Sequence, residues 1–185
     1  KFHEGAIKSS NVLNRLKLQK NDYFLVSAHR EENIDSNENF DALLDSLNAI
    51  VEKYQKKVIV STHPRTMVRL KSLNKFYMNE KIEFMKPLGF FDYIALQLNA
   101  LCVVSDSGTI TEESSILNFP AVTLREAHER PEGMDEGTLI MCGVSRDHVL
   151  KSIEVVLAQS ETESIAMKTV ADYDVSNVSL KVLRI

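Results

Sequence analysis

The amino-acid sequence predicts an α/β domain with a doubly wound parallel sheet. Short continuous apolar runs, bounded by polar turns, are typical of parallel strands that are buried on both faces. Longer segments with helical spacing alternate with these runs, which is the pattern of helices that cover both faces of such a sheet. With 185 residues, of which 44% are hydrophobic, the chain can bury one sizeable core, and we expect one domain.

Six apolar runs are the predicted strands, and apolar stripes predict the main helices. The strands cover residues 23–28, 58–62, 82–85, 101–105, 121–124 and 138–141. The first long helix follows the first strand, with its stripe at Phe40, Leu43, Leu44, Leu47, Ile50, Val51 and Tyr54. The same spacing recurs before the fourth strand at Phe91, Ile94, Ala95 and Leu98, and after the sixth at Val149, Ile153, Val156 and Leu157, where Ser145 is the expected N-cap.

Charge and composition exclude some classes of partner. The chain has 22 basic and 26 acidic residues, a formal net charge of −4 and no block of like charge. We therefore expect no nucleic-acid partner, whereas a small anionic ligand is compatible with this balance. The apolar runs are only as long as strands, so we expect no membrane partner. Cys102 and Cys142 lie in or beside apolar runs without metal-ligand spacing, which predicts buried reduced thiols and a cytoplasmic location.

The turn after the fourth strand is the main candidate for a ligand site. Ser107, Gly108 and Thr109 follow the buried run and open a segment with helical spacing. A helix N-terminus with small, hydroxyl-bearing residues is suited to bind phosphate, although Asp106 or Ser107 could instead simply cap this helix. Glu113 lies little more than one turn into the helix, where a carboxylate suits ribose hydroxyls better than phosphate. The predicted ligand is a nucleoside diphosphate.

Other candidates follow the neighbouring strands, because ligands bind beyond the carboxyl ends of parallel strands. His29 directly follows the first strand, where it can hydrogen-bond a phosphate or transfer a proton, although a lone His is more often structural. Glu31 and Glu32 are expected to pair with Arg30 or to face solvent. His63 is expected to cap or pack against the helix that begins after the second strand.

Leu88 and Tyr93 are the candidates for binding a base. The segment Pro87-Leu88-Gly89 can offer backbone groups to the edge of a base, and Tyr93 can lay its ring against it, although such a ring more often packs in a core. Arg130 precedes Pro131, which favours an extended backbone, so its guanidinium can reach a diphosphate or pair with neighbouring glutamates. The sequence has no GxGxxG motif, Walker loop, Cys/His metal cluster or nucleophile elbow, which argues against dehydrogenases, P-loop enzymes, zinc enzymes and α/β-hydrolases.

Three segments together resemble the non-hydrolysing UDP-N-acetylglucosamine 2-epimerases. They are SAHREEN at 27–33, SDSGTITEE at 105–113 and ERPE at 129–132, and the likeness spans nearly the whole chain. Members of that family have two Rossmann-like domains arranged as in GT-B glycosyltransferases. Residues 1–185 resemble the C-terminal, UDP-binding domain, with its core at 20–160 and, at 161–185, the start of the segment that returns to the N-terminal domain. The chain begins without Met, which also predicts a piece of a longer polypeptide, expected to form a homodimer when full length.

The resemblance implies a reaction and a set of roles. In the family reaction the C2 proton is removed, UDP is eliminated to leave a 2-acetamidoglucal, and UDP is re-added after reprotonation on the opposite face, with no metal or redox cofactor. The acid and base carboxylates belong to the N-terminal domain, so this half alone is expected to be inactive. The implied roles are the following: His29 assists the departing or returning UDP, Ser107, Gly108 and Thr109 hold phosphate, Glu113 binds ribose, Arg130 reaches the diphosphate, and the Leu88 backbone and Tyr93 contact uracil.

The sequence departs from the family pattern at two positions, and two alternative functions remain to be distinguished. Thr109 stands where many members have a second Gly, and Glu31 where they often have a basic residue. Residues 128–138 look most like the branch that forms UDP-N-acetyl-L-fucosamine for capsule and O-antigen, which leaves the sugar open. The alternatives are the donor-binding domain of a GT-B glycosyltransferase, which has no particular need for the turn at residues 29–33, and a non-catalytic nucleotide-sugar binding module.

Overall fold

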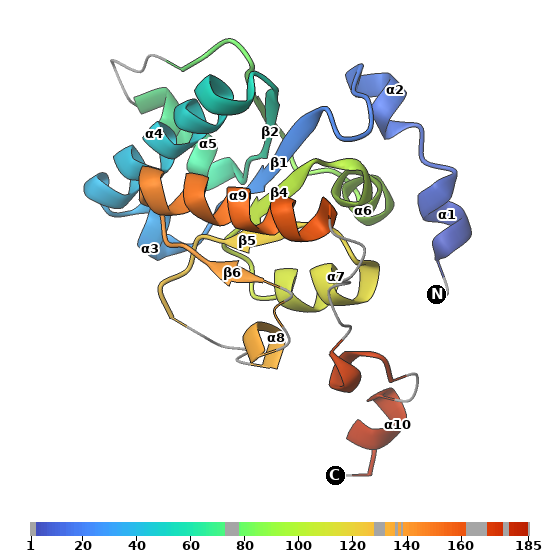
Figure 1. The fold of residues 1–185 in the computed structure, drawn as a ribbon. Coiled ribbons are helices and arrows are strands. Elements are labelled where there is room, and N and C mark those ends of the chain that lie inside the picture. The colour runs from blue at the N-terminus through green and yellow to red at the C-terminus, as the bar shows by residue number, and fades with distance from the viewer. Residues whose placement is uncertain are drawn as a thin grey trace.

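A six-stranded parallel sheet forms the centre of the molecule, as the sequence predicts (Figure 1). The computed structural model describes residues 3–72, 78–127, 132–135, 137, 139–161, 170–175 and 178–184. The strand order is β3-β2-β1-β4-β5-β6, so the chain starts in the middle of the sheet and winds outward in both directions. The strands are β1 (Tyr23–Ser27), β2 (Lys57–Ser61), β3 (Ile82–Met85), β4 (Cys102–Ser105), β5 (Ala121–Thr123) and β6 (Ile140–Met141).

Helices cover both faces of the sheet. On one face α4 (Asn37–Tyr54) and α9 (Arg146–Glu161) lie side by side, with α5 (Pro64–Ser72) near them, and on the other lie α6 (Phe90–Asn99) and α7 (Ile110–Leu117) (Figure 1). The shorter helices are α1 (Glu4–Lys8), α2 (Val12–Leu16), α3 (Glu31–Ile34), α8 (Glu132–Asp135), the 3-10 turn η1 (Ala171–Tyr173) and α10 (Val178–Val182). None of the described helices is long and apolar enough to cross a membrane.

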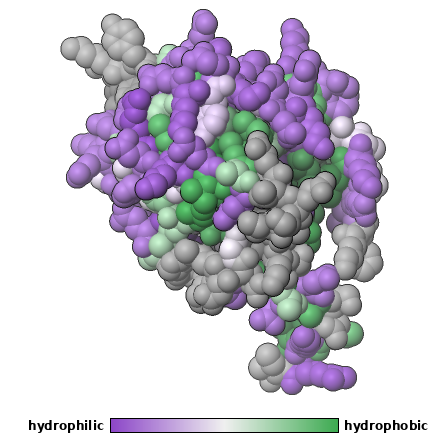
Figure 2. Space-filling view, viewed as in Figure 1, coloured by the Kyte–Doolittle hydropathy of each residue, from purple (hydrophilic) through white to green (hydrophobic). Residues whose placement is uncertain are grey.

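Side-chain alternation along the strands divides the core into two clusters. Phe24 and Val26 of β1 face the cluster under α4 and α9, whereas Tyr23 and Leu25 face the cluster under α6 and α7. The β1 side chains that face either cluster are fully buried. The strand therefore appears in the sequence as a continuous apolar run. On the face of the molecule that Figure 2 shows, hydrophilic residues cover much of the coloured surface.

The predicted stripes of the two longest helices are confirmed, and the stripe of α6 is wrong in one position. The apolar residues of α4 from Phe40 to Val51 are buried, and Val149, Ile153 and Val156 of α9 join the same cluster. In α6, however, Phe91 is exposed and stacks on His3 with ring centroids 5.3 Å apart. Leu96 is buried instead, in the same core cluster as Tyr23, whose hydroxyl donates to the Leu96 carbonyl at 2.6 Å.

The strand register aligns three serines at the carboxyl edge of the sheet. Ser27 of β1 pairs with Ser61 of β2 on one side and with Ser105 of β4 on the other. Because the strands are parallel and end together, the loops that follow them begin at the same edge. This edge is where the sequence places most of its candidate residues.

Candidate active site

A cavity of about 450 Å³ opens at this edge, above the ends of β1, β2 and β4. Ser27, Ser61 and Ser105 line it from the strand ends. The loops after the strands and the first turns of α6 and α7 bring in six of the eight residues that the sequence predicts for the site, namely His29, Leu88, Tyr93, Ser107, Thr109 and Glu113. Residues up to 84 positions apart in the chain, from His29 to Glu113, therefore meet in one place.

The turn between β4 and α7 supplies the hydroxyl groups of the cavity. Ser107 Oγ lies 3.0 Å from Thr109 Oγ1, and Gly108 lies between them in the turn. Thr109 occupies the N-cap position of α7, but its side chain accepts no bond from the first turn of the helix. Thr109 Oγ1 donates instead to Glu113, so the start of α7 combines two hydroxyls with the positive end of the helix dipole.

Glu113 is held in place by two hydrogen bonds. Its Oε1 accepts from Thr109 Oγ1 at 2.8 Å, and its Oε2 accepts from Gln97 Nε2 at 2.5 Å. Gln97 is a buried residue of α6, so it fixes the carboxylate from behind. A carboxylate oxygen has further lone pairs, which leaves Glu113 able to accept a bond from a ligand hydroxyl in the cavity.

Leu88 and Tyr93 form the wall that comes from the loop between β3 and α6. Tyr93 lies one turn into α6, as expected, and is partly buried against the second core cluster. Burial raises the pKa of Tyr93 to about 12, with a hydrogen bond to Ser27 acting in the opposite direction, so the phenol stays protonated at neutral pH. Phe90, which is 64% exposed, also lines the cavity; the sequence places it in the loop at the ligand edge but predicts no ligand contact for it, although an aromatic ring directly after Gly89 is a signal for one.

His29 sits at the carboxyl end of β1 with 47% of its side chain exposed. Its backbone nitrogen donates to both oxygens of Asp106, at 3.1 and 2.9 Å. Its Nδ1 lies 3.4 Å from Asp106 Oδ1. The imidazole therefore lies between a buried carboxylate and the open cavity.

Asp106 does not cap α7, which was one alternative from the sequence. Its fully buried carboxylate points across the edge to the loop after β1, where it also accepts from the Arg30 backbone nitrogen at 2.9 Å and from Asn33 Nδ2 at 3.1 Å. Ser107 does not cap α7 with its hydroxyl either, since that group contacts Thr109. The capping alternative is therefore wrong for both residues.

The charged residues near His29 pair within and between loops. Glu32 Oε1 lies 3.8 Å from Arg30 Nε, as expected, whereas Glu31 accepts from Arg65 Nη1 at 2.8 Å. His63 Nδ1 accepts from the Arg65 backbone nitrogen at 3.3 Å, which confirms its predicted capping role at the start of α5. His63 also lines the cavity, which the sequence reasoning did not expect.

Arg130 lies outside the described residues, together with most of the segment from 128 to 138. Its role at a diphosphate therefore stays a prediction. Within the part of the chain that is described, no three His, Cys, Asp or Glu side chains are grouped so that they could hold a metal ion. Cys102 and Cys142 are both free and buried, as predicted.

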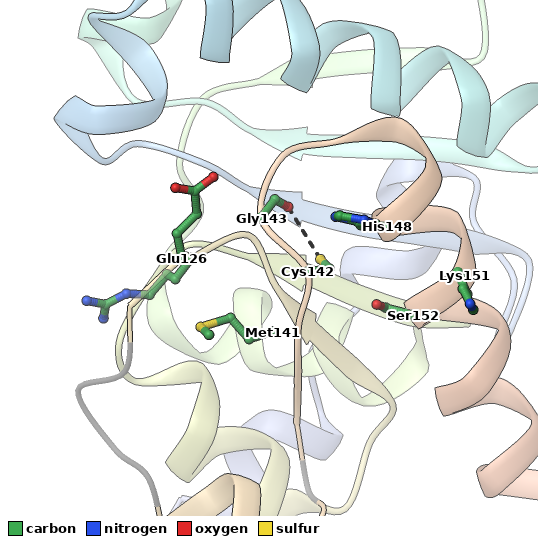
Figure 3. Close-up of a pocket in the computed structure, with 8 residues that line it drawn as sticks. Glu126, Met141, Cys142, Gly143, His148, Lys151 and Ser152 are labelled. Carbon is green, nitrogen blue, oxygen red and sulfur yellow. Dashed lines mark hydrogen bonds between the residues drawn. The ribbon is translucent and has the colours of Figure 1, made fainter.

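A second cavity, of about 460 Å³, lies at the far half of the same edge (Figure 3). His148, Lys151 and Ser152 project into it from the first turns of α9, and Cys142 and Gly143 border it after β6. Burial raises the pKa of the Cys142 thiol to about 12, and its Sγ donates to the Gly143 carbonyl at 3.4 Å. Six of the seven described residues that were expected to bind the ligand line the first cavity, and none of the seven lines this one.

The family model for UDP-N-acetylglucosamine 2-epimerase matches residues 2–185. The UDP-N-acetylglucosamine 2-epimerase of Methanocaldococcus jannaschii is 39% identical over 139 residues, which is 74% of this chain and 38% of that protein. The solved structure of the Rickettsia bellii UDP-N-acetylglucosamine 2-epimerase superposes with a TM-score of 0.86 at 42% identity, covering 99% of this chain and 48% of that one.

Two further solved structures are similar. The M. jannaschii UDP-GlcNAc 2-epimerase, in complex with UDP-GlcNAc and UDP, gives a TM-score of 0.82 at 31% identity and covers 97% of this chain and 50% of that one. The ADP-heptose heptosyltransferase II of Escherichia coli gives 0.57 at 15% identity, a likeness of fold alone. The chain thus spans about half the length of the solved epimerases that it matches.

Proposed function

This chain belongs to the UDP-N-acetylglucosamine 2-epimerase family, and we propose that it is the UDP-binding half of a two-domain UDP-2-acetamido-sugar 2-epimerase. One observation carries the proposal: six residues expected from the sequence to serve a UDP-sugar line a single cavity at the carboxyl edge of the sheet. A relative that shares this fold is bound to UDP-GlcNAc and UDP in its solved structure, which supports the choice of ligand.

The three parts of UDP are assigned to three walls of the cavity. The diphosphate lies at the start of α7, where Ser107, Gly108 and Thr109 offer hydroxyl and backbone donors to an anion. The ribose lies against Glu113, because a carboxylate that is already fixed by two donors can accept from a diol. The uracil lies along Leu88 and Tyr93. Arg130 is expected at the diphosphate from the sequence and from the family resemblance.

The chemistry assigned to this half is assistance to the leaving group. In the proposed reaction the C2 proton is removed and the C1–O bond breaks, which gives a 2-acetamidoglucal and UDP. Reprotonation of C2 on the opposite face and re-addition of UDP at C1 complete the inversion. His29 stabilises the charge or supplies the proton at the diphosphate oxygen as that bond breaks, and takes the proton back on re-addition. The carboxylates that act on C2 are assigned to the other half of the polypeptide.

The sugar is assigned at the level of its class. The relatives are named for UDP-N-acetylglucosamine, whereas residues 128–138 resemble the branch that forms UDP-N-acetyl-L-fucosamine in capsule and O-antigen synthesis. Sugar contacts come mostly from the half that this chain does not contain. A UDP-2-acetamido sugar is therefore the proposed substrate, and the two branches are separated by experiment.

Product analysis of the complete polypeptide is the test. The protein is incubated in D2O with UDP-N-acetylglucosamine and, separately, with other UDP-2-acetamido sugars, and the products are followed by NMR. We expect inversion at C2, retention of the UDP group and deuterium at C2 of the product. Loss of UDP with transfer of the sugar to an acceptor would instead identify a glycosyltransferase, and absence of turnover with every sugar, despite UDP binding, would identify a binding module.

A further inference from the structure

Asp106 is a carboxylate buried completely at the carboxyl edge of the sheet. Burial of an ionised carboxylate is costly unless donors replace its water. The two carboxylate oxygens of Asp106 accept different numbers of hydrogen bonds. Oδ2 accepts from the backbone nitrogens of His29 and Arg30, both at 2.9 Å, and from Asn33 Nδ2 at 3.1 Å. Among the described residues, Oδ1 accepts a hydrogen bond only from the His29 backbone nitrogen, at 3.1 Å.

The oxygen with fewer hydrogen-bond donors, Asp106 Oδ1, is the one that faces the imidazole of His29. His29 Nδ1 lies 3.4 Å from Asp106 Oδ1, while the ring lines the cavity. An ionised carboxylate can only accept hydrogen bonds, and a neutral imidazole carries one N–H. The proton is therefore favoured on Nδ1, which leaves Nε2, on the opposite side of the ring, free to exchange a proton with a ligand.

We propose that Asp106 is the positioning residue of His29: it fixes the tautomer and the orientation of the imidazole. This inference rests on the proposed function, in which His29 acts at the diphosphate. When His29 donates its Nε2 proton to the departing oxygen, it becomes the neutral Nδ1–H imidazole that Asp106 favours. On re-addition Nε2 takes the proton back, so the imidazole returns to its starting state.

Asp106 also joins the two loops that form the site. Its own backbone nitrogen donates to the Ser27 carbonyl at 3.0 Å, and it directly precedes the Ser107 turn assigned to the diphosphate. A single residue thus sets the distance between the phosphate turn and the His29 loop. A simple helix cap at this position would not connect them.

The first test observes the imidazole directly, without an activity assay. The chain is labelled with [15N]histidine, His29 is assigned by its loss in His29→Gln, and the ring nitrogens are recorded at alkaline pH, where the imidazole is neutral. We expect the Nδ1–H tautomer, which is the minor one for histidine in water. A wild-type His29 in the Nε2–H tautomer would overturn the proposal, and this result needs no variant of Asp106 to fold.

Asp106→Asn is the matching substitution. Its single carbonyl oxygen fits the Oδ2 position with three donors, which turns its amide group toward His29 Nδ1. We expect His29 then to change to the Nε2–H tautomer. Asn33→Ala is the control, because it removes one donor from Oδ2 and leaves Oδ1 facing the ring, so the Nδ1–H tautomer should persist. The same tautomer in wild type and Asp106→Asn would contradict the inference.

The second test is a double-mutant cycle on turnover by the complete polypeptide. Asp106→Asn should lower kcat by about 100-fold or more with a change in KM of only a few fold, as for a group that acts through a proton-transferring histidine. In a His29→Ala background the same substitution should have little further effect on kcat. An equal loss in both backgrounds would show that Asp106 does not act through His29. If no UDP-sugar is turned over by the wild type, the proposed function fails while the tautomer result still decides the role of Asp106.

Discussion

Glu113 is the predicted ligand contact whose side chain is held most firmly by its neighbours. It is fixed by Thr109 in front and by the buried Gln97 behind, so it offers its remaining lone pairs to the cavity without reorganisation. Glu113→Ala would leave the Gln97 amide buried without this acceptor and so lower stability as well as affinity. Glu113→Gln keeps an acceptor for Gln97 and is the cleaner change.

Glu113→Gln should therefore weaken UDP binding by about 1 to 3 kcal/mol, the range for a hydrogen bond to a charged group. Calorimetric titration of UDP into the 185-residue chain measures this directly. Glu112→Gln is the control, since Glu112 does not line the cavity assigned to UDP and its substitution should leave UDP affinity unchanged. Equal affinities of the wild type and Glu113→Gln would remove the ribose assignment.

His29 should affect turnover more than binding. In the complete polypeptide, His29→Ala is expected to lower kcat by roughly 100-fold or more with a smaller change in KM, which is the scale of positioned acid–base or electrostatic help. His29→Asn should be partly active if only a hydrogen bond is needed and inactive if a proton is passed. Steady-state kinetics that stay within a few fold of wild type for His29→Ala would leave this residue as loop structure.

At the level of single residues, the sequence predicted those side chains whose position follows from the end of a strand. His29 and Ser107 come directly after buried runs, so their place at the edge follows from the parallel sheet alone. Asp106 was weighed only as a helix cap, because its actual partners lie 73 to 77 positions away. The sequence alone does not show whether a carboxylate that precedes a helix accepts hydrogen bonds from that helix or from a distant loop.

The elements were predictable in proportion to their length and burial. All six strands were found. The central strands β1 and β4 are covered on both faces and so give unbroken apolar runs, whereas the edge strands β3 and β6 are only partly buried. The short helices α1, α2 and α3 were not predicted, since four or five residues are too few to show a helical period. The error at Phe91 has a different cause, because α1 packs beside α6 and His3 stacks on a ring that lies outside the core.

The start of α4 offers a stability prediction for an element. Ser36 caps this helix, with its side chain accepting from the Asn39 backbone nitrogen at 3.2 Å. Ser36→Ala should reduce the free energy of unfolding by about 1 kcal/mol, the usual loss for an N-cap, without changing UDP affinity. Urea denaturation followed by circular dichroism is the measurement. Ser160→Ala, near the end of α9, is the matched control and should change stability by less than about 0.5 kcal/mol. An equal effect of both substitutions would mean that the Ser36 cap contributes nothing.

At the scale of the whole molecule, one edge of the sheet concentrates the polar chemistry. The register ends β1, β2 and β4 together, and the winding outward from β1 places the loops of both halves of the sheet around one cavity. The fold class thus follows from the sequence, and so does the edge of the sheet at which the candidate site is proposed. The identity of the sugar does not, because the chain spans about half of its solved relatives and the rest of the site is assigned to the other half.

Calorimetric titration of UDP into the 185-residue chain tests the central claim most directly. The diphosphate, ribose and base contacts are all assigned to this half, so the chain alone should bind UDP with one-to-one stoichiometry and modest affinity, in the micromolar to millimolar range. Glu113→Gln should weaken that binding, and Glu112→Gln should not. No binding of UDP at millimolar concentration, by a chain that circular dichroism shows to be folded, would contradict the account.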